Sequence, residues 1–320
     1  MNPWVRLGLR IASLPIFDVK KNYSLIRKAQ ENIAQRDMEE FQEEHPEYQL
    51  IDHYLLTDDS QYSVPIRIFP PTDARTSNII IFFHGGGFVT GNVDTYTRAC
   101  REITEASNTV LFSVDYRKAP EHPYPAGLSD CYKVALEIVR HFIDTGKRKI
   151  FIMGDSAGGN LATVVTRLLM ELEEIKVDGE ILIYPTMGYD YSVEFAKTMV
   201  FPSLQEKGYD FGLTLQNMRN YYDLYLEDQS LMKTDENVTP LISDKLNLLP
   251  RTLIVTAEHD PLLDEAKAYA HRLEENQVET TYRMISEVPH GFLTRSTLFP
   301  EAHTELMELL QDFLEDKHVR

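Results

Sequence analysis

Apolar and polar positions form blocks along the chain, and the character of these blocks changes near residue 79. Before that point, residues 20–44 are polar with apolar side chains at helical spacing, which predicts an amphipathic helix. Two strand candidates follow, Leu50–Thr57 and Tyr62–Phe69, and the second alternates apolar with polar positions. We expect these two strands to pair as an antiparallel hairpin.

From residue 79 onward, short apolar runs alternate with segments long enough to be helices. The strand candidates are Ile79–Phe83, Thr109–Val114, Lys149–Met153, Glu180–Tyr184, Thr252–Thr256 and Thr281–Ile285. The helix candidates are Thr95–Ala106, Gly127–Phe142, Ala157–Glu173 and Leu262–Leu273. Continuous apolar runs indicate strands buried on both faces, and their alternation with helices indicates βαβ units. The predicted fold class is therefore α/β, with a mostly parallel sheet flanked by helices.

Residues 188–245 separate two strand candidates by more than one crossover helix requires. This stretch is rich in aromatic residues, namely Tyr189, Tyr191, Phe195, Phe201, Tyr209, Phe211, Tyr221, Tyr222 and Tyr225. We predict an inserted helical cap, packed with the N-terminal helix over one end of the sheet, in which most of these aromatics form the cap's own small core. The predicted organisation is N-terminal cap helices (1–48), a catalytic domain (49–187 and 246–320) and an inserted cap segment (188–245).

Composition and charge narrow the classes of function. The formal net charge is −18, from 32 basic and 50 acidic side chains. Such a field repels phosphate backbones and anionic bilayers, so we expect neither nucleic acid nor a membrane as a partner. The two cysteines, Cys100 and Cys131, form no C-x-x-C pair, which argues against a disulfide or zinc scaffold.

The first residues of the chain are mildly apolar and need a separate interpretation. Arg6, Arg10 and Pro15 interrupt the apolar positions, which is unlike a secretory signal. No other run approaches the ~20 apolar residues that a membrane span needs. The sequence therefore predicts a cytoplasmic protein.

The strongest chemical signal is the segment Gly154-Asp155-Ser156-Ala157-Gly158, between a strand candidate and a helix candidate. A serine nucleophile needs its hydroxyl exposed on a sharp strand-to-helix turn, and glycines two residues away on each side allow that turn. The start of the following helix also favours a developing negative charge. A plain turn is the alternative interpretation, and the strand and helix on either side argue against it.

A second signal is His84-Gly85-Gly86-Gly87-Phe88, at the end of the strand candidate Ile79–Phe83. Successive glycines expose backbone N–H groups that can hold an oxyanion, and each such donor stabilises the transition state by about 3 kcal/mol. A phosphate cradle is disfavoured, because Asn92 stands where a P-loop needs lysine and Thr90 breaks the G-x-G-x-x-G pattern. We interpret His84 as a structural residue of this loop and not as the base.

A nucleophilic serine needs a neutral base, and the base needs an acid to orient it. Asp260 follows the strand candidate Thr252–Thr256, and His290 follows the strand candidate Thr281–Ile285. Both lie at carboxyl ends of strands, where open α/β sheets bind their ligands. The chain order Ser156, Asp260, His290 is the order found in α/β-hydrolases.

These motifs together resemble the hormone-sensitive-lipase family of bacterial-type carboxylesterases. The resemblance covers residues 79–300 and is carried by His84–Phe88, Asp115–Glu121, Gly154–Asn160, Tyr184-Pro185, Asp260–Asp264 and His290–Phe292. It implies an α/β-hydrolase fold with an eight-stranded sheet and a helical cap. It also implies carboxylesterase activity that needs neither a cofactor nor a metal.

The resemblance also implies a role for single residues. Ser156 is the nucleophile, His290 the base and Asp260 the orienting acid. The oxyanion hole consists of the backbone N–H groups of Gly85, Gly86 and Ala157. Lys118 departs from the pattern, because the family usually has an apolar residue there. Three other acids compete with the orienting aspartate, namely Glu258, Asp264 and Glu287.

The predicted function is a serine carboxylesterase that acts on small-molecule esters with short- to medium-chain acyl groups. A binding protein on the same fold is one alternative, but plant gibberellin receptors of this kind lack the catalytic histidine, and His290 is present. Amide hydrolysis by the same residues stays open. A metal hydrolase is disfavoured because the chain has no H-E-x-x-H motif. The sequence is compatible with a homodimer and does not determine the oligomeric state.

Overall fold

The computed structural model describes residues 1–44, 50–57, 62–71, 78–143, 148–172, 174–188 and 190–317. Within these ranges one sheet of eight strands has the order β1-β2-β4-β3-β5-β6-β7-β8. The strands are β1 (Ile51–Leu56), β2 (Ser63–Phe69), β3 (Ile79–Phe83), β4 (Val110–Val114), β5 (Ile150–Asp155), β6 (Gly179–Ile183), β7 (Thr252–His259) and β8 (Thr280–Pro289). β2 runs antiparallel to both β1 and β4, and every other pairing is parallel. The predicted hairpin and the mostly parallel sheet are confirmed.

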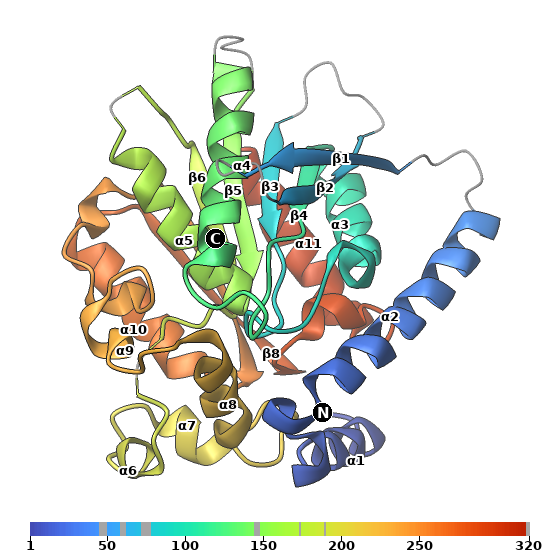
Figure 1. Ribbon diagram of the computed structural model, residues 1–320, viewed down its shortest axis with the longest axis vertical. Helices are drawn as coiled ribbons and strands as arrows, with labels where there is room; N and C mark the ends of the chain where they lie inside the picture. Colours follow the sequence, from blue (N-terminus) through green and yellow to red (C-terminus); the bar gives the residue numbers. More distant parts are fainter. Residues whose placement is uncertain are drawn as a thin grey trace.

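Helices cover both faces of this sheet (Figure 1). They are α1 (Pro3–Ala12), α2 (Val19–Glu44), α3 (Val93–Ser107), α4 (Ala126–Ile143), α5 (Ala157–Met170), α6 (Val193–Ala196), α7 (Pro202–Lys207), α8 (Leu215–Tyr225), α9 (Leu231–Thr234), α10 (Leu263–Glu275) and α11 (Pro300–Leu314). Short 3₁₀ turns add η1 (Pro15–Phe17), η2 (Pro240–Ile242), η3 (Leu246–Leu248) and η4 (Phe292–Arg295). The four helix candidates from the second half of the pattern correspond to α3, α4, α5 and α10.

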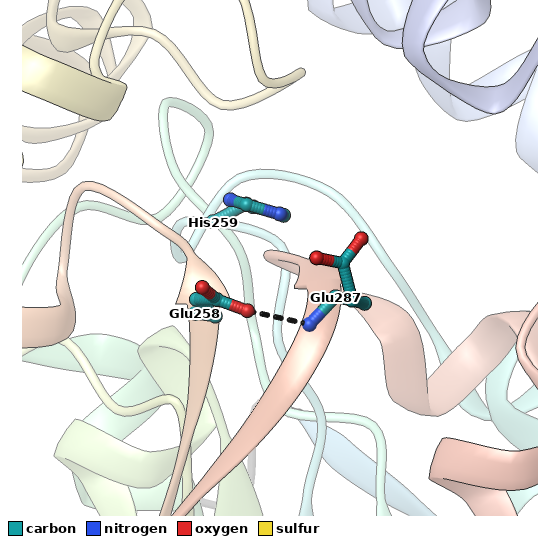
Figure 2. A group of neighbouring side chains, drawn as sticks. All are labelled: Glu258, His259 and Glu287. Carbon is teal, nitrogen blue, oxygen red and sulfur yellow. Dashed lines mark hydrogen bonds between the residues drawn. The ribbon is translucent and has the colours of Figure 1, made fainter. Parts of the chain in front are cut away.

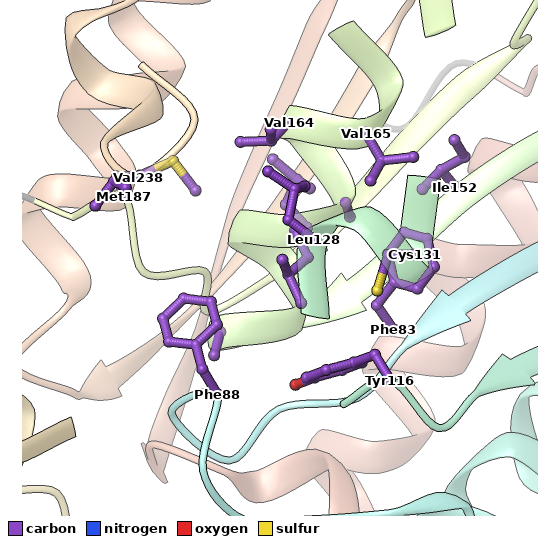
Figure 3. Close-up of a cluster of buried hydrophobic side chains, with 14 of the residues drawn as sticks. Phe83, Phe88, Tyr116, Leu128, Cys131, Ile152, Val164, Val165, Met187 and Val238 are labelled. Carbon is purple, nitrogen blue, oxygen red and sulfur yellow. The ribbon is translucent and has the colours of Figure 1, made fainter. Parts of the chain in front are cut away.

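Strand β3 shows why its run of five apolar residues belongs at the centre of the sheet. Every residue of the strand is buried, and successive side chains point to opposite faces. Ile81 and Phe83 join the core on the side of α4 and α5, whereas Ile80 and Phe82 join the core on the side of α3 and α11. Figure 3 shows part of the first core, where side chains of β3 and β5 lie beside those of α4 and α5. A strand with a polar face could not fill this position.

Two segments that are far apart in the sequence lie side by side at the carboxyl ends of the strands (Figure 1). The N-terminal helices α1 and α2 contact the segment that carries α6, α7 and α8. The backbone N–H of Val19 donates to Asn217 (3.2 Å), and Lys20 pairs with Asp223 (2.8 Å). Arg6 pairs with Asp210 at 2.6 Å. We call these two segments, residues 1–44 and 190–235, the cover of the site.

The aromatic residues of the cover pack partly on one another and partly on the sheet side. Tyr191 lies against Tyr222, with ring centroids 5.4 Å apart. Tyr222 and Tyr225 also pack on Phe88 of the glycine loop, at 5.8 and 3.9 Å. Only some of the aromatic residues of the inserted segment therefore form the separate core that was expected for them. Tyr189, named in the same prediction, lies outside the described residues.

The mildly apolar stretch at the start of the chain forms α1. Leu9 faces inward, whereas Trp4 is 79% exposed and Leu7 and Ile11 are about half exposed. In the part of the chain that the structure describes, no helix is long and apolar enough to cross a membrane.

Candidate active site

Strand β5 carries Ser156 to the first turn of α5 on a strained backbone. Ser156 has φ 54° and ψ −120°, a combination that side chains rarely adopt and that active sites retain. A Cβ on Gly154 would lie 2.1 Å from the carbonyl oxygen of Gly158, and one on Gly158 would lie 2.0 Å from that of Phe83. Only glycine fits at either position, which is why the turn needs this spacing.

The structure brings Ser156, His290 and Asp260 into one hydrogen-bonded chain. Nε2 of His290 lies 2.9 Å from Oγ of Ser156, and Nδ1 lies 2.7 Å from Oδ2 of Asp260. The other carboxylate oxygen of Asp260 accepts the backbone N–H of Leu262 at 2.9 Å, and the side chain is 1% exposed. An imidazole held in this way can take the hydroxyl proton while the aspartate fixes its tautomer.

The competing acids form hydrogen bonds or ion pairs elsewhere. Asp264 accepts the backbone N–H of Ser203 at 2.7 Å, which ties α10 to the cover. Glu258 accepts the backbone N–H of Glu287 at 2.7 Å. The carboxylate that contacts the ring of His290 is that of Asp260.

Glu258, His259 and Glu287 lie together beside the end of β7, as Figure 2 shows, with ligand atoms within 4.8 Å of one another. They are the only group of three metal-ligating side chains found among the described residues. Both carboxylates already have protein partners, whereas Nδ1 of His259 has no hydrogen-bond partner among the described residues. Glu258 accepts the backbone hydrogen bond above, Glu287 pairs with the N-terminal amine, and His259 stacks on Phe211 at 5.0 Å. We therefore assign no metal to this group.

His84 is buried at the base of the glycine loop. Its ring stacks on Tyr116 at 4.3 Å, and its Nδ1 lies 2.8 Å from the carbonyl oxygen of Gly85. Burial lowers the pKa of His84, which keeps the ring neutral in its interior position. Lys118, the departure from the family pattern, reaches Asp115 at 2.5 Å, and Asp115 also lies 3.7 Å from Nε2 of His84. The lysine is thus accommodated by an ion pair.

The glycine loop requires one correction to the predicted oxyanion hole. The backbone N–H of Gly85 donates to Oδ1 of Asp155 at 2.7 Å, so it is committed to a buried carboxylate. Gly86 and Gly87, with φ of 115° and 61°, line the cavity together with Ser156. Among the described residues, none accepts a hydrogen bond from their N–H groups. The prediction for Gly85 is therefore wrong, and Gly87 is the second glycine positioned to donate.

Asp155 is a site residue that sequence reasoning missed. Its buried carboxylate accepts the N–H of Gly85 and the hydroxyl of Tyr96 (3.0 Å), which joins the glycine loop to the serine turn. Burial raises the pKa of Asp155 to about 6, against the effect of these hydrogen bonds. Asp155 occupies a free position of the G-x-S-x-G motif, so the motif gave no signal for it.

A cavity of about 210 Å³ opens above Ser156 and His290. The sheet side contributes Gly86 and Gly87, and the cover contributes Gln30, Leu213, Met218, Tyr221 and Tyr222. Arg295 of η4 completes one side. The sequence motifs did not point to Gln30 or Arg295, because neither belongs to a periodic pattern or a recognisable spacing.

Residues 80–294 match the family model described as alpha/beta hydrolase fold, which is more than half of the chain. The chain belongs to the α/β-hydrolase fold family. Its relatives include an arylesterase of Saccharolobus solfataricus, 31% identical over 78% of this chain and 80% of that protein. They also include the carboxylic ester hydrolase LipN of Mycobacterium tuberculosis, 30% identical over 72% of this chain. That alignment spans 61% of the length of LipN.

Solved structures of other α/β-hydrolases agree with this membership. A hyperthermophilic esterase from the archaeon Pyrobaculum calidifontis superposes with a TM-score of 0.83 at 27% identity, covering 99% of this chain and 98% of that one. A thermostable carboxylesterase cloned from a metagenomic library gives a TM-score of 0.78 at 29% identity. The predicted resemblance to hormone-sensitive-lipase-type carboxylesterases is confirmed, and with it the class of carboxylic-ester hydrolase at the level of the family.

Proposed function

We propose that this α/β-hydrolase cleaves carboxylic esters with short- to medium-chain acyl groups, with Ser156 as nucleophile, His290 as base and Asp260 as orienting acid. The observation that carries the proposal is the continuous contact from Asp260 through His290 to Ser156, at 2.7 and 2.9 Å. The names of the esterase relatives support the same reaction.

The reaction follows from these contacts in two steps. Oγ of Ser156 attacks the ester carbonyl carbon while its proton passes to Nε2 of His290. The bond to the alcohol oxygen breaks, and His290 returns the proton to the leaving alcohol. In the second step His290 takes a proton from water as the water oxygen attacks the acyl-enzyme. The acid product then leaves, and the proton returns to Oγ of Ser156. His290 thus carries the transferred proton in both steps.

The oxyanion of each tetrahedral intermediate needs donors beside Ser156. We assign this role to the backbone N–H groups of Gly86, Gly87 and Ala157. Ala157 opens α5, so its N–H is one of the first N–H groups of the helix that have no intrahelical acceptor. Pre-oriented donors of this kind stabilise the developing charge because they need no reorganisation.

The cover limits the size of the substrate. A cavity of about 210 Å³ lined by Met218, Tyr221 and Tyr222 accommodates a short acyl chain and its alcohol better than a long lipid chain. We propose that residues 1–48 and 188–245 act as a cap over the catalytic domain formed by residues 49–187 and 246–320. A cytoplasmic location and a homodimer remain predictions from the sequence.

The test is hydrolysis of 4-nitrophenyl esters from acetate to dodecanoate by the wild type and by Ser156→Ala. We expect turnover of the short esters, a decline with longer chains, and loss of turnover in Ser156→Ala. Ser129→Ala, an exposed serine on α4, is the matched control and should keep full activity. Equal turnover by Ser156→Ala and the wild type would contradict the assignment. No turnover of esters, with cleavage of 4-nitroanilides, would favour an amidase.

A further inference from the structure

Arg295 is a charged residue in the active-site cavity that the proposed mechanism does not use. It ends η4, five positions after His290, and its side chain lines the cavity that contains Ser156. It also lines a second, adjoining cavity. The residues common to both cavities are Gln30, Gly86, Thr90, Tyr96 and Arg295. Arg295 therefore lies where the cavity above Ser156 meets the adjoining cavity.

Among the described residues, no carboxylate lies within 4.0 Å of the guanidinium of Arg295, and none accepts a hydrogen bond from it. Two other arginines with little exposure are paired with carboxylates. Arg67 contacts Asp52 and Asp94, each at 2.7 Å, and Arg117 contacts Asp130 at 2.7 Å. Arg272, which is partly buried, donates instead to two backbone carbonyl oxygens.

The carboxylates that do lie near the two cavities are already paired. Asp155 accepts the N–H of Gly85, and Asp260 contacts His290. Asp37, on the rim of the adjoining cavity, lies 3.8 Å from Arg98. None of the three forms an ion pair with Arg295, so its guanidinium is the charged group of the cavity left to meet a ligand.

The surroundings of Arg295 make this charge costly without a ligand. Burial lowers the pKa of Arg295, and the nearby hydroxyls of Tyr184 and Tyr96 oppose that shift. A guanidinium stays protonated under these conditions, so Arg295 keeps an unpaired positive charge in a partly buried position. Gln30, which faces the same cavities, has a buried Oε1 with no partner in the described part of the chain. Among the described residues, the amide oxygen of Gln30 and the guanidinium of Arg295 thus lack protein partners in the same cavity.

We propose that Arg295 binds a carboxylate of the substrate, and that the preferred substrates are small esters that carry one negative charge near the bond to be cleaved. This inference rests on the proposed function and names its substrate class. A planar guanidinium matches a carboxylate in two parallel hydrogen bonds, which gives both affinity and orientation. The carboxylate can belong to the acyl part, as in a monoester of a short dicarboxylic acid, or to the alcohol part, as in an O-acyl hydroxy acid.

The kinetic test compares charged and neutral esters of matched shape. For the acyl side the pair is ethyl hydrogen succinate and ethyl pentanoate, and for the alcohol side it is acetoxyacetate and propyl acetate. The measured quantity is the ratio of kcat/KM for the charged ester to kcat/KM for the neutral one. We expect the wild type to prefer the charged member of one pair, and the pair concerned shows which side of the ester Arg295 faces.

The variants show whether this preference depends on Arg295. In Arg295→Gln the ratio should fall roughly 10- to 100-fold, as expected for the loss of a hydrogen-bonded charge pair. Arg295→Lys should keep part of the preference. Arg219→Gln removes the same charge from an exposed position on α8 and should leave the ratio unchanged. An unchanged ratio in Arg295→Gln, or an equal loss for both esters, would overturn the proposal.

Binding to an inactive enzyme separates this inference from the proposed function. Calorimetric titration of Ser156→Ala with ethyl hydrogen succinate and with acetoxyacetate should show, for at least one of the two, binding that weakens at least tenfold in Ser156→Ala/Arg295→Gln. If the wild type cleaves no ester but this difference in binding persists, the proposed function fails and the carboxylate site stands. If the wild type cleaves neutral esters and the titration shows no difference, the esterase stands and the carboxylate site fails.

Discussion

The carboxyl ends of the strands and the cover contribute to the same cavity, yet the contacts that hold each of them in place differ. Ser156 and Asp260 follow the largely buried strands β5 and β7, and His290 follows the partly exposed edge strand β8. Their mutual contacts are short and largely hidden from water. The cover is joined to the sheet side by buried side chains such as Tyr225, and its two segments are joined to each other in part by ion pairs with partly exposed partners, such as Arg6 with Asp210. Its first helix leaves Trp4 in solvent.

This difference separates two functions of the site. Groups that move protons must stay within a few tenths of an ångström of their partners, and rigid strand ends provide that. Groups that select a substrate can tolerate more movement, and exposed ion pairs contribute little stability each. We therefore expect substitutions at the carboxyl ends of the strands to lower kcat. We expect substitutions in the cover to alter KM or specificity.

The largest expected effect is that of Asp260→Asn. The amide cannot hold His290 in the tautomer that accepts a proton, so kcat should fall about 10⁴-fold. Asp264→Asn is the matched control four residues away, because its carboxylate binds the backbone of Ser203 in the cover. Steady-state kinetics with 4-nitrophenyl acetate measures both. A larger loss in Asp264→Asn than in Asp260→Asn would reverse the assignment of the acid.

Gly87→Ala should have the next largest effect. Its φ of 61° suits glycine, and an added Cβ would lie 2.3 Å from the ring of Tyr221. The loop must shift to relieve this contact, so we expect kcat to fall about 100-fold through the loss of an oxyanion donor.

Gly8→Ala on α1 is the control for that substitution, because an added Cβ there meets nothing within 4 Å. It should leave kcat unchanged. If Gly87→Ala retained wild-type kcat, Gly87 would not be an oxyanion donor. Denaturation midpoints of both variants show whether a loss of activity reflects unfolding.

A smaller effect is expected where the cover meets the glycine loop. Arg27 of α2 donates to the carbonyl oxygens of Val89 and Ala119, each at 2.7 Å, and pairs with Glu121. Arg27→Gln should raise KM several-fold and lower the free energy of unfolding by about 2 kcal/mol, with a smaller change in kcat. Arg36→Gln, exposed on the same helix, should change neither. A fall in kcat with unchanged KM would contradict the proposed division of functions.

The smallest effect on catalysis is expected for Glu265, whose substitution acts on stability and its pH dependence. Burial raises its pKa to about 8, although it accepts hydrogen bonds from Met187 (2.8 Å) and Tyr191 (2.9 Å). A carboxyl whose folded-state pKa is raised favours folding below its unfolded pKa, and this contribution is lost as the pH rises through about 8. The wild type should therefore lose stability between pH 5 and 8.

Glu265→Gln should remove this part of the pH dependence. The slope of the unfolding free energy against pH should become flatter by at most about 1.4 kcal/mol per pH unit. Urea denaturation at pH 5, 6.5 and 8 measures the slope. Glu274→Gln, an exposed position on α10, is the control and should keep the wild-type slope. Identical slopes in Glu265→Gln and the wild type would show that Glu265 is ionised across this range.

Much of this molecule was predictable from local pattern. Each strand candidate from residue 50 onward corresponds to a strand. For central strands such as β3 the reason is burial on both faces, which demands a continuous apolar run. β1 lies exposed at the edge of the sheet, so burial does not explain its pattern. Ser156, Asp260 and His290 could be named from the sequence because each stands beside glycine or turn residues at the end of a strand candidate. The order of these residues along the chain gave the remaining information.

Other features depended on contacts between residues that are distant in sequence. The three glycines after His84 look equivalent in the sequence, and only the approach of Asp155 from β5 shows that the N–H of Gly85 is committed. Arg295 gave no signal, because its lack of a counter-ion depends on which carboxylates the fold brings near it. The joining of α1 to Asp210 and of α2 to α8 likewise rests on pairs about 200 residues apart. The sequence by itself determined which segments form strands and which residues can carry the chemistry, since these depend on local backbone and side-chain properties. The tertiary structure alone decided which polar groups are satisfied and which face the substrate, since these depend on long-range packing.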